Sequence, residues 1–347
     1  MKYFKLYFGL ASGFLSSRWL KLESILVKQK SEESISSDEW ERLYYSTLFS
    51  EAFSMLGSFH YNKIIGGALT LLAELDRIKE VSIMLDSGAF TVWTLGEEID
   101  IVKYIEYILK LKRLYDLGDR LSIVNLDVIP DLTLRGVALK EEIDRSVIQS
   151  CLNFRRIKEA GISNVIAVHH LGESGDHLKM ILDEGVEYLG LGGVARRTGK
   201  AKDERLWFNQ TFNYLNNIGF RGKVHGFGIT AESMVRDYPW DSVDSVSYFK
   251  GTGLGSVYIF DEKKARLRQF QVSELGDRVG GIYDKDREWI LSRTKVGFDR
   301  SWDQLKNYWV RQLVSFKNWS AFAEWRSGDE AMVINKGGFI EQTGLGF

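Results

Sequence analysis

The stretch Val81–Trp93, which reads VSIMLDSGAFTVW, decides the fold that this chain is expected to adopt. A short apolar run leads into Asp86, a Ser-Gly-Ala turn follows, and Phe90 and Trp93 come next. Buried parallel strands read as continuous apolar runs, and such a strand can deliver a carboxylate to the rim of a sheet. The stretch therefore predicts a parallel strand with a functional group at its end.

Four later stretches repeat this design. Each is a short apolar run that ends in a polar residue or a glycine: LSIVNLD at Asp127, NVIAVHH at His169 and His170, YLGLGG at Gly192 and Gly193, and KVHGFG at Gly228. Helical patterns lie between them. The alternation predicts an α/β fold, a (β/α)8 TIM-like barrel, in which active sites form at the C-terminal ends of the strands.

The expected barrel covers residues 1–261 and carries two additions. Residues 3–10 are its expected first strand, 240–248 a late strand, and 255–261 a final strand or hairpin arm. An N-terminal helical insertion is expected over about residues 14–60, with a helix that opens after Asp38 and runs through about Met55. Residues 262–347 are expected to form a helical extension that packs on the barrel, because no Pro-rich or Ser-rich linker separates them from it.

The extension differs from the rest of the chain in charge and aromatic content. From Glu262 to Arg326 there are 14 Lys and Arg residues against 9 Asp and Glu residues, although the whole chain has a net charge of −1. The same segment holds five of the ten tryptophans. Basic residues interleaved with aromatic ones suit phosphate contacts and base stacking, so nucleic-acid binding is expected here. The alternative is that these tryptophans form the core of a helical cap.

The single cysteine, Cys151, excludes an intramolecular disulfide and a zinc site built from several cysteines. The first residues lack the continuous apolar region of a signal peptide, and no stretch approaches the roughly 20 apolar residues of a membrane span. The stretch LGLGGVA lacks the spacing of a dinucleotide fingerprint. We expect a cytoplasmic protein with no membrane partner, no cofactor and no metal.

Three strand-end aspartates, Asp86, Asp127 and Asp244, are expected to converge on one mouth of the barrel. Several carboxylates in one cleft serve either a divalent metal or the making and breaking of glycosidic bonds. His169, His170 and His225 sit in or at the ends of strands, where a histidine can bind substrate or serve the structure alone. Five basic residues follow the Gly192-Gly193 strand and suit a polyanionic substrate or a solvated loop: Arg196, Arg197, Lys200, Lys202 and Arg205.

Six motifs between about residues 80 and 250 stand in the order of a known family: LDSGAF, NLD, VIAVHH, YLGLGGVA, HGFGIT and DSVDSVS. In these motifs the chain resembles the tRNA-guanine transglycosylase superfamily, closest to the phage and bacterial branch that exchanges guanine in DNA for a 7-deazaguanine. The resemblance implies a (β/α)8 barrel that swaps a guanine-like base through a covalent ribosyl-enzyme intermediate. The residues before and after this region carry little of the resemblance.

The resemblance also implies roles for individual residues. Asp244 falls on the nucleophile, Asp86 on the general acid and base, and Asp127 on the carboxylate that reads the Watson–Crick edge of the base. The implied base-binding set is Ser87, Phe90, His169, Gly192, Gly193, Val194, His225 and Gly226, in which Phe90 and His225 sandwich the base. Arg196, Arg197, Lys200 and Lys202 are expected to contact the nucleic acid.

The tRNA enzymes carry a Cys3His zinc site after the nucleophile strand, which a chain with one cysteine lacks. The expected function is therefore a DNA-guanine transglycosylase of a bacterial or phage-infected cell. Its expected partners are duplex DNA with a flipped guanine, or single-stranded DNA, and a 7-deazaguanine base such as preQ0. Three alternatives remain: a zinc-free tRNA base-exchange enzyme, a non-catalytic nucleic-acid-binding barrel, and a metal-dependent hydrolase that uses the three aspartates.

Overall fold

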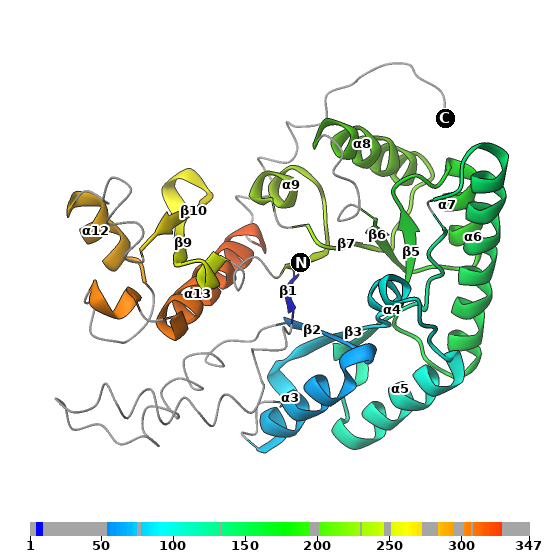
Figure 1. Cartoon of the computed structure of the whole chain (residues 1–347), viewed down its shortest axis with the longest axis horizontal. Coiled ribbons are helices and arrows are strands. Elements are labelled where there is room, and N and C mark those ends of the chain that lie inside the picture. Colours follow the sequence, from blue (N-terminus) through cyan, green and yellow to red (C-terminus); the bar gives the residue numbers. More distant parts are fainter. Residues whose placement is uncertain are drawn as a thin grey trace.

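A closed barrel of parallel strands forms the centre of the molecule (Figure 1). The computed structural model describes residues 5–9, 54–74, 78–131, 133–193, 201–229, 231–245, 251–272, 284–294, 302–306 and 308–327. Within these residues, the barrel strands pair in chain order and β1 closes the barrel against β8. The strands are β1 (Lys5–Gly9), β2 (Ser54–Ser58), β3 (Ser82–Asp86), β4 (Leu121–Val124), β5 (Val165–His170), β6 (Tyr188–Gly192), β7 (Lys223–Gly226) and β8 (Ser242–Ser245). The predicted (β/α)8 architecture is confirmed.

Helices follow the strands and form an outer layer around the barrel (Figure 1). They are α3 (Asn62–Glu74), α4 (Ala89–Leu95), α5 (Ile101–Tyr115), α6 (Gly136–Glu159), α7 (Gly175–Asp183), α8 (Ala201–Asn217) and α9 (Glu232–Asp237). Asp100 caps α5 by accepting hydrogen bonds from the backbone N–H groups of Val102 and Lys103. Gly161 follows the end of α6 with a φ of +80°, the left-handed conformation that ends many helices.

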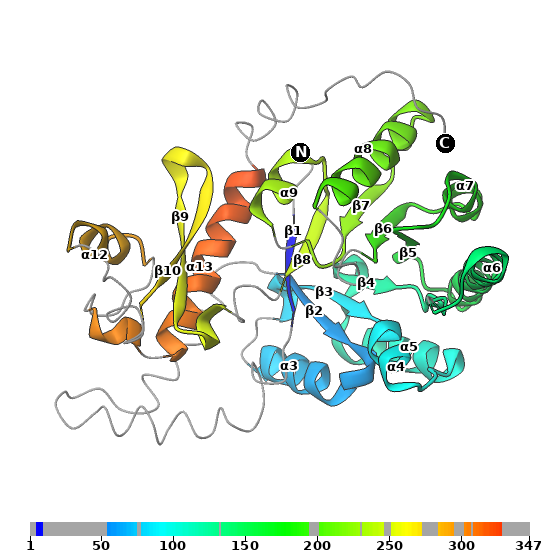
Figure 2. The same cartoon turned by 45° about the horizontal axis from the view of Figure 1, so that its top comes forward.

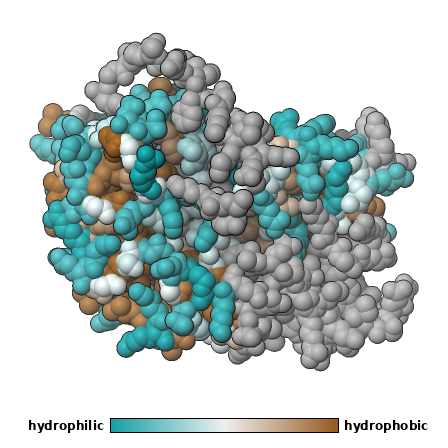
Figure 3. All heavy atoms as spheres, turned by 180° about the vertical axis from the view of Figure 1, so that it is seen from behind, coloured by the Kyte–Doolittle hydropathy of each residue, from teal (hydrophilic) through white to brown (hydrophobic). Residues whose placement is uncertain are grey.

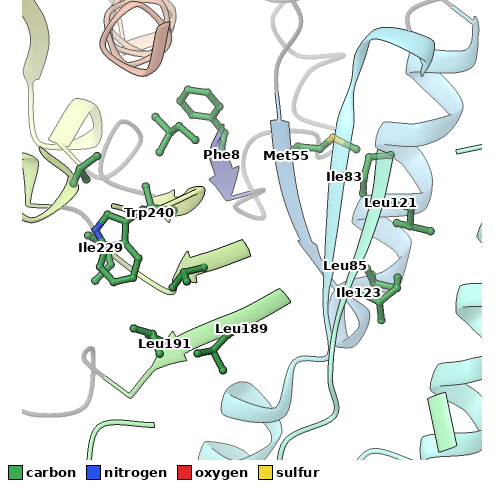
Figure 4. Close-up of a cluster of buried hydrophobic side chains, with 14 of the residues drawn as sticks. Phe8, Met55, Ile83, Leu85, Leu121, Ile123, Leu189, Leu191, Ile229 and Trp240 are labelled. Carbon is green, nitrogen blue, oxygen red and sulfur yellow. The ribbon is translucent and has the colours of Figure 1, made fainter. Parts of the chain in front are cut away.

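The strands alternate between two apolar layers. Side chains that point outward meet the helices and form the larger core, as Figure 4 shows for Ile83 and Leu85 of β3 and for Leu189 and Leu191 of β6. Side chains that point inward fill the barrel and form a second cluster: Tyr7, Met84, Val124, Ile166, Val168 and Tyr188. Because both faces are buried, the strands carry nearly continuous apolar sequence.

One barrel strand lies where the sequence predicted an insertion. Residues 54–58 form β2, which pairs in parallel with β1 and β3, so the predicted helix through Met55 and the insertion to residue 60 are wrong at that end. The run SMLGS is short and contains two serines and a glycine, which gives it a weak strand signal. The earlier part of the predicted insertion lies outside the described residues.

Residues 255–261, expected to be a final strand or a hairpin arm, form a hairpin arm. Strand β9 (Ser256–Asp261) pairs antiparallel with β10 (Arg266–Gln271) in a separate hairpin, so the barrel strands end at Ser245 and not at Asp261. The hairpin runs alongside α13 (Tyr308–Ser327), which lies between it and the barrel, and α12 (Asp284–Leu291) lies farther out (Figure 2).

The extension packs directly on the barrel, as expected. The Phe316 ring of α13 lies 4.3 Å from the Phe8 ring on the outer side of β1. The Arg326 guanidinium donates hydrogen bonds to the carbonyl oxygens of Val235 and Tyr238 at the end of α9. Burial lowers the pKa of Arg326, against an opposing effect of Asp241. Helix α13 therefore covers β1 and connects the extension to α9.

The described tryptophans of the extension are buried or partly buried in its core. Trp319 is buried and Trp325 is partly buried, and both pack near Phe322. Trp289 is partly buried and lies beneath the guanidinium groups of Arg268 and Arg293, each 4.9 Å from its ring. The helical-cap interpretation therefore holds for Trp319 and Trp325, whereas Trp289 combines an aromatic ring with two cations.

The described surface is mixed in polarity. On the side opposite to Figure 1, polar residues cover much of the described surface and apolar residues show between them (Figure 3). Among the described residues, no helix has the length and apolar character that crossing a bilayer requires.

Candidate active site

A cavity of about 240 Å³ opens at the C-terminal ends of the barrel strands. It is lined by six residues that the sequence singled out: Asp86, Phe90, Asp127, Gly192, Gly193 and Asp244. Further lining residues include Leu56, Ile129, Val168, Phe227 and Gly228, together with His170, which the sequence named only as a strand-end histidine that can bind substrate. The expectation that the three aspartates converge on one cavity is confirmed.

Asp244 points into the barrel from β8. It lies in phase with the inward-facing Ser242, while the buried Val243 between them belongs to the outer core. Its Oδ1 atom accepts a hydrogen bond of 2.7 Å from the backbone N–H of Gly228 and lies 3.3 Å from Nε2 of His225. The Asp244 side chain is 15 % exposed, so the carboxylate is held in place and still faces the cavity.

Asp86 ends β3 and enters the cavity beside the turn that the sequence predicted. Burial, together with the charges of Asp127 and Asp244, raises the pKa of Asp86 from its ordinary 3.8 to about 7. The backbone N–H groups of Gly88 and Ser87 partly oppose this rise. A carboxyl with a pKa near neutrality can both give and take a proton at physiological pH.

The turn after Asp86 requires glycine at position 88. Gly88 has a φ of +84°, a conformation that L side chains rarely adopt. A Cβ there would lie 2.8 Å from Oγ of Ser58 and 2.9 Å from Cβ of His60, so the backbone passes close to the segment after β2. This close approach places the first turn of α4, with Phe90, at the rim of the cavity.

Asp127 lies just beyond β4 and is paired with a histidine. Its Oδ2 atom is 2.8 Å from Nε2 of His170, and the two side chains are 9 % and 20 % exposed. Strand alternation explains the partner, because His170 lies in phase with the inward-facing Ile166 and Val168. The histidine that faces the cavity is therefore His170.

His169 does not reach the cavity, which corrects its predicted role in base binding. It points outward with Val165 and Ala167, packs against Trp207 at a ring distance of 5.6 Å, and is 2.9 Å from Oε2 of Glu173 through Nδ1. Burial alone would raise the pKa of Glu173, but the hydrogen bond from His169 and the charges of the two histidines lower it. His169 therefore anchors the loop after β5.

His225 points into the barrel but lies below the cavity, so its predicted place against a base is wrong. It is fully buried, and the Phe227 ring lies 4.4 Å from it at an interplanar angle of 74°. Phe227, two residues further along, lines the cavity instead. The aromatic rings at the cavity are thus Phe90 and Phe227, while His225 supports Asp244 from beneath.

Two other predicted residues lie behind the cavity wall. Ser87 is fully buried, and its Oγ accepts a hydrogen bond from the backbone N–H of Ala89 at the start of α4. Gly226 packs against Ile229 and Trp240, since a Cβ there would lie 2.6 Å from the Ile229 side chain. Both residues shape the site without lining it.

Most of the predicted basic loop lies outside the described residues. Val194, Arg196, Arg197 and Lys200 fall there, as does the side chain of Lys202, whose backbone belongs to α8. Arg205 is described and pairs with Asp237 at 2.9 Å. Among the described residues, no three His, Cys, Asp or Glu side chains form a group that could hold a metal ion.

Phe227 reaches the cavity because β6 carries a glycine beneath it. A Cβ at Gly190 would lie 2.3 Å from Cε2 of Phe227 and 3.0 Å from Cγ2 of Ile166. Side chains of a strand alternate between its two faces, so every second residue from an inward-facing one also points inward. Counting in this way from Ile166 and from His225 identifies His170 and Phe227 as inward-facing residues. The Gly228 amide carries no sequence signal, since any residue has a backbone N–H.

A comparison with family models finds no match for this chain, and a comparison with curated proteins finds none either.

Proposed function

We propose that this protein is a DNA-guanine transglycosylase that exchanges guanine in DNA for a 7-deazaguanine base such as preQ0. The observation that supports the proposal best is that Asp86, with a pKa raised to about 7, shares one cavity with Asp244 and Asp127. Base exchange at a sugar carbon needs a nucleophile and a proton-transfer group in such an arrangement. The six ordered motifs supply the identity of the base.

In the proposed reaction, Asp244 attacks C1′ of the target deoxyribose. A carboxylate oxygen forms a bond to C1′ while the bond from C1′ to N9 of guanine breaks and its electron pair leaves with the base. Oδ1 of Asp244 accepts a hydrogen bond from Gly228 and lies 3.3 Å from Nε2 of His225, so Oδ2 is the expected nucleophile. The product of this step is a covalent deoxyribosyl-aspartate.

Asp86 handles the proton in both halves of the reaction. In its neutral form it protonates the departing guanine, and in its charged form it removes the N9 proton of the incoming base. The incoming nitrogen then displaces Asp244 from C1′. Two displacements at one carbon retain the anomeric configuration.

Asp127 and His170 suit recognition of the polar edge of the base. Oδ2 of Asp127 is engaged with His170, which leaves Oδ1 to accept hydrogen bonds from ring N–H and amino groups of a guanine. Phe90 and Phe227 offer apolar ring surface for a planar base, and the cavity suits an extruded purine better than a stacked one. Gly192 and Gly193 let the backbone of β6 come close to the ligand.

A DNA substrate is favoured over tRNA because the single cysteine excludes a Cys3His zinc element. On the extension, Arg268 and Arg293 lie over Trp289 at partly exposed positions, where guanidinium groups suit phosphate and the ring suits a base.

The deciding experiment incubates the protein with radiolabelled guanine or preQ0 and with duplex DNA, single-stranded DNA or tRNA. We expect incorporation into DNA, and we expect Asp244→Asn to abolish it while the protein keeps its native circular dichroism. When the incoming base is withheld, a protein–DNA adduct that resists SDS is expected. Asp119→Asn, an exposed carboxylate at the other end of the barrel, is the matched control and should keep activity.

The other outcomes identify the alternatives. Incorporation into tRNA alone would replace the DNA substrate with tRNA. DNA binding without incorporation, unchanged by Asp244→Asn, would indicate a non-catalytic barrel. Release of products by hydrolysis, lost on addition of EDTA, would indicate a metal-dependent hydrolase.

A further inference from the structure

A chain of polar side chains runs through the interior of the barrel beneath Asp244. His225 lies 3.3 Å from Oδ1 of Asp244 through Nε2 and 2.7 Å from Oγ of Ser242 through Nδ1. The same Oγ atom is 2.6 Å from the hydroxyl oxygen of Tyr188. These groups are buried in the interior, where an unpaired polar group would be costly.

Other polar side chains lie farther toward the opposite end of the barrel. Tyr7 belongs to the same inner cluster as Tyr188, and the Tyr188 and Ser122 side chains lie close enough to affect its pKa. Oγ of Ser122 lies 2.9 Å from Nδ2 of Asn164, which precedes β5. Nδ2 also donates to the carbonyl oxygens of Leu121 and Asp119, and these two acceptors fix which side of the amide carries the nitrogen.

The Asp244 end determines the direction of the hydrogen bonds from Tyr188 to Asp244. An ionised carboxylate only accepts, so His225 donates from Nε2 to Asp244, and a neutral His225 then accepts at Nδ1 from the Ser242 hydroxyl. Because the one proton of Ser242 is used in this bond, Ser242 accepts from Tyr188. Burial raises the pKa of Tyr188 well above its ordinary value, so this tyrosine keeps the proton that it donates.

We propose that Tyr188, Ser242 and His225 are positioning residues that hold Asp244 for nucleophilic attack, with His225 neutral and protonated on Nε2. In this tautomer Nδ1 accepts from the Ser242 hydroxyl and Nε2–H donates to Asp244. The donor, together with the Gly228 amide, fixes Oδ1 and directs Oδ2 to the cavity. Aligned hydrogen bonds in a buried chain reinforce one another. The catalytic part of this inference rests on the proposed function, and the tautomer does not.

The tautomer can be measured without any activity. Nitrogen-15 NMR of the full chain labelled at its five histidines distinguishes protonated from unprotonated ring nitrogens, and His225→Gln assigns the signals of His225. We expect Nε2 protonated and Nδ1 unprotonated near neutral pH. Ser242→Ala should abolish this single state. A proton on Nδ1 in the wild-type protein would reverse the chain and overturn the proposal.

The positioning role is tested by removing one hydroxyl. Tyr188→Phe should lower kcat of base exchange by roughly tenfold and leave KM unchanged, the factor expected for loss of about 1.4 kcal/mol in the transition state. Tyr238→Phe is the matched control, because this buried tyrosine is hydrogen-bonded to Arg205 and Asn209 outside the barrel.

Equal kcat values for Tyr188→Phe and Tyr238→Phe would overturn the positioning role. If the wild-type protein exchanges no base at all, the proposed function fails, while the NMR result still decides whether the chain runs in the direction inferred here.

Discussion

Replacing Asp86 with asparagine should stabilise the protein near neutral and alkaline pH while it abolishes base exchange. The folded protein raises the pKa of this carboxyl from 3.8 to about 7. The folded state therefore binds the Asp86 proton more tightly than the unfolded chain. Stability from this group is fully present below pH 3.8, falls as the pH rises toward about 7, and is absent above that.

The size of the effect follows from the shift. The shift is about three pKa units and one unit corresponds to about 1.4 kcal/mol, so the charged carboxylate destabilises the fold by about 4 kcal/mol above pH 7. Between about pH 5 and pH 7 the unfolded chain has lost the Asp86 proton while the folded protein still holds it, and this interval accounts for about two of the three units. The stabilisation by protonated Asp86 should therefore be ~3 kcal/mol smaller at about pH 8 than at about pH 5. Asparagine has nearly the same shape and does not titrate.

The assay is urea unfolding of both proteins at these two pH values. The free energy of unfolding of Asp86→Asn minus that of the wild type should grow by ~3 kcal/mol from about pH 5 to about pH 8. Asp119→Asn, at an exposed position, serves as the control for loss of one carboxylate. A second readout is the Asp86 pKa in Asp244→Asn, which should fall because the Asp244 charge helps to raise it.

The reasoning would be refuted by a stability difference for Asp86→Asn that is the same at both pH values. It would also be refuted by an Asp86 resonance that titrates near pH 4 in the wild-type protein. Either result would mean that the carboxyl is better solvated than its place in the cavity indicates, and it would remove the argument for Asp86 as the acid and base.

Three further outcomes are expected. Gly190→Ala should destabilise the fold by roughly 1–3 kcal/mol because its Cβ would meet Phe227. Gly67→Ala is the control, because a Cβ at this position in α3 would meet open space, and it should not destabilise the fold. Thermal unfolding of the two variants measures the difference. His169→Ala should lower stability by roughly 2–4 kcal/mol because it leaves the buried Glu173 carboxylate without this partner, and an unchanged unfolding midpoint would contradict its anchoring role. His170→Ala should instead raise KM for the base at nearly unchanged stability, and equal KM values would remove His170 from the site.

The strand-end residues were predictable because barrel strands are apolar runs bounded by polar or glycine residues. Asp86, Asp127 and Asp244 were located in this way, and the structure brings them to one cavity. The prediction placed His169 at the cavity, whereas His170 lies there. The four residues before the two histidines in VIAVHH are all apolar, so no alternation of polar and apolar residues distinguishes the two faces of the strand. In such a strand the direction of a side chain depends on counting from a neighbour whose direction is known.

Other features depend on partners that are distant in sequence. Whether residues 256–261 join the barrel or a hairpin is decided by pairing with β10 and packing against α13, and no local pattern states this. The hydrogen-bonded chain beneath Asp244 joins residues of β6, β7 and β8, so each of its members reads in the sequence as an ordinary buried polar residue. Only the closed barrel brings them together.

The cover of β1 by α13 has a consequence for synthesis on the ribosome. Strand β1 is made well before its lateral partner β8 and the ring of Phe316, because both follow much later in the chain. The apolar outer side of β1 therefore stays uncovered by α13 while some 300 further residues are translated. Premature termination before α13 should yield aggregates, and a truncated barrel intended for crystallisation should include α13.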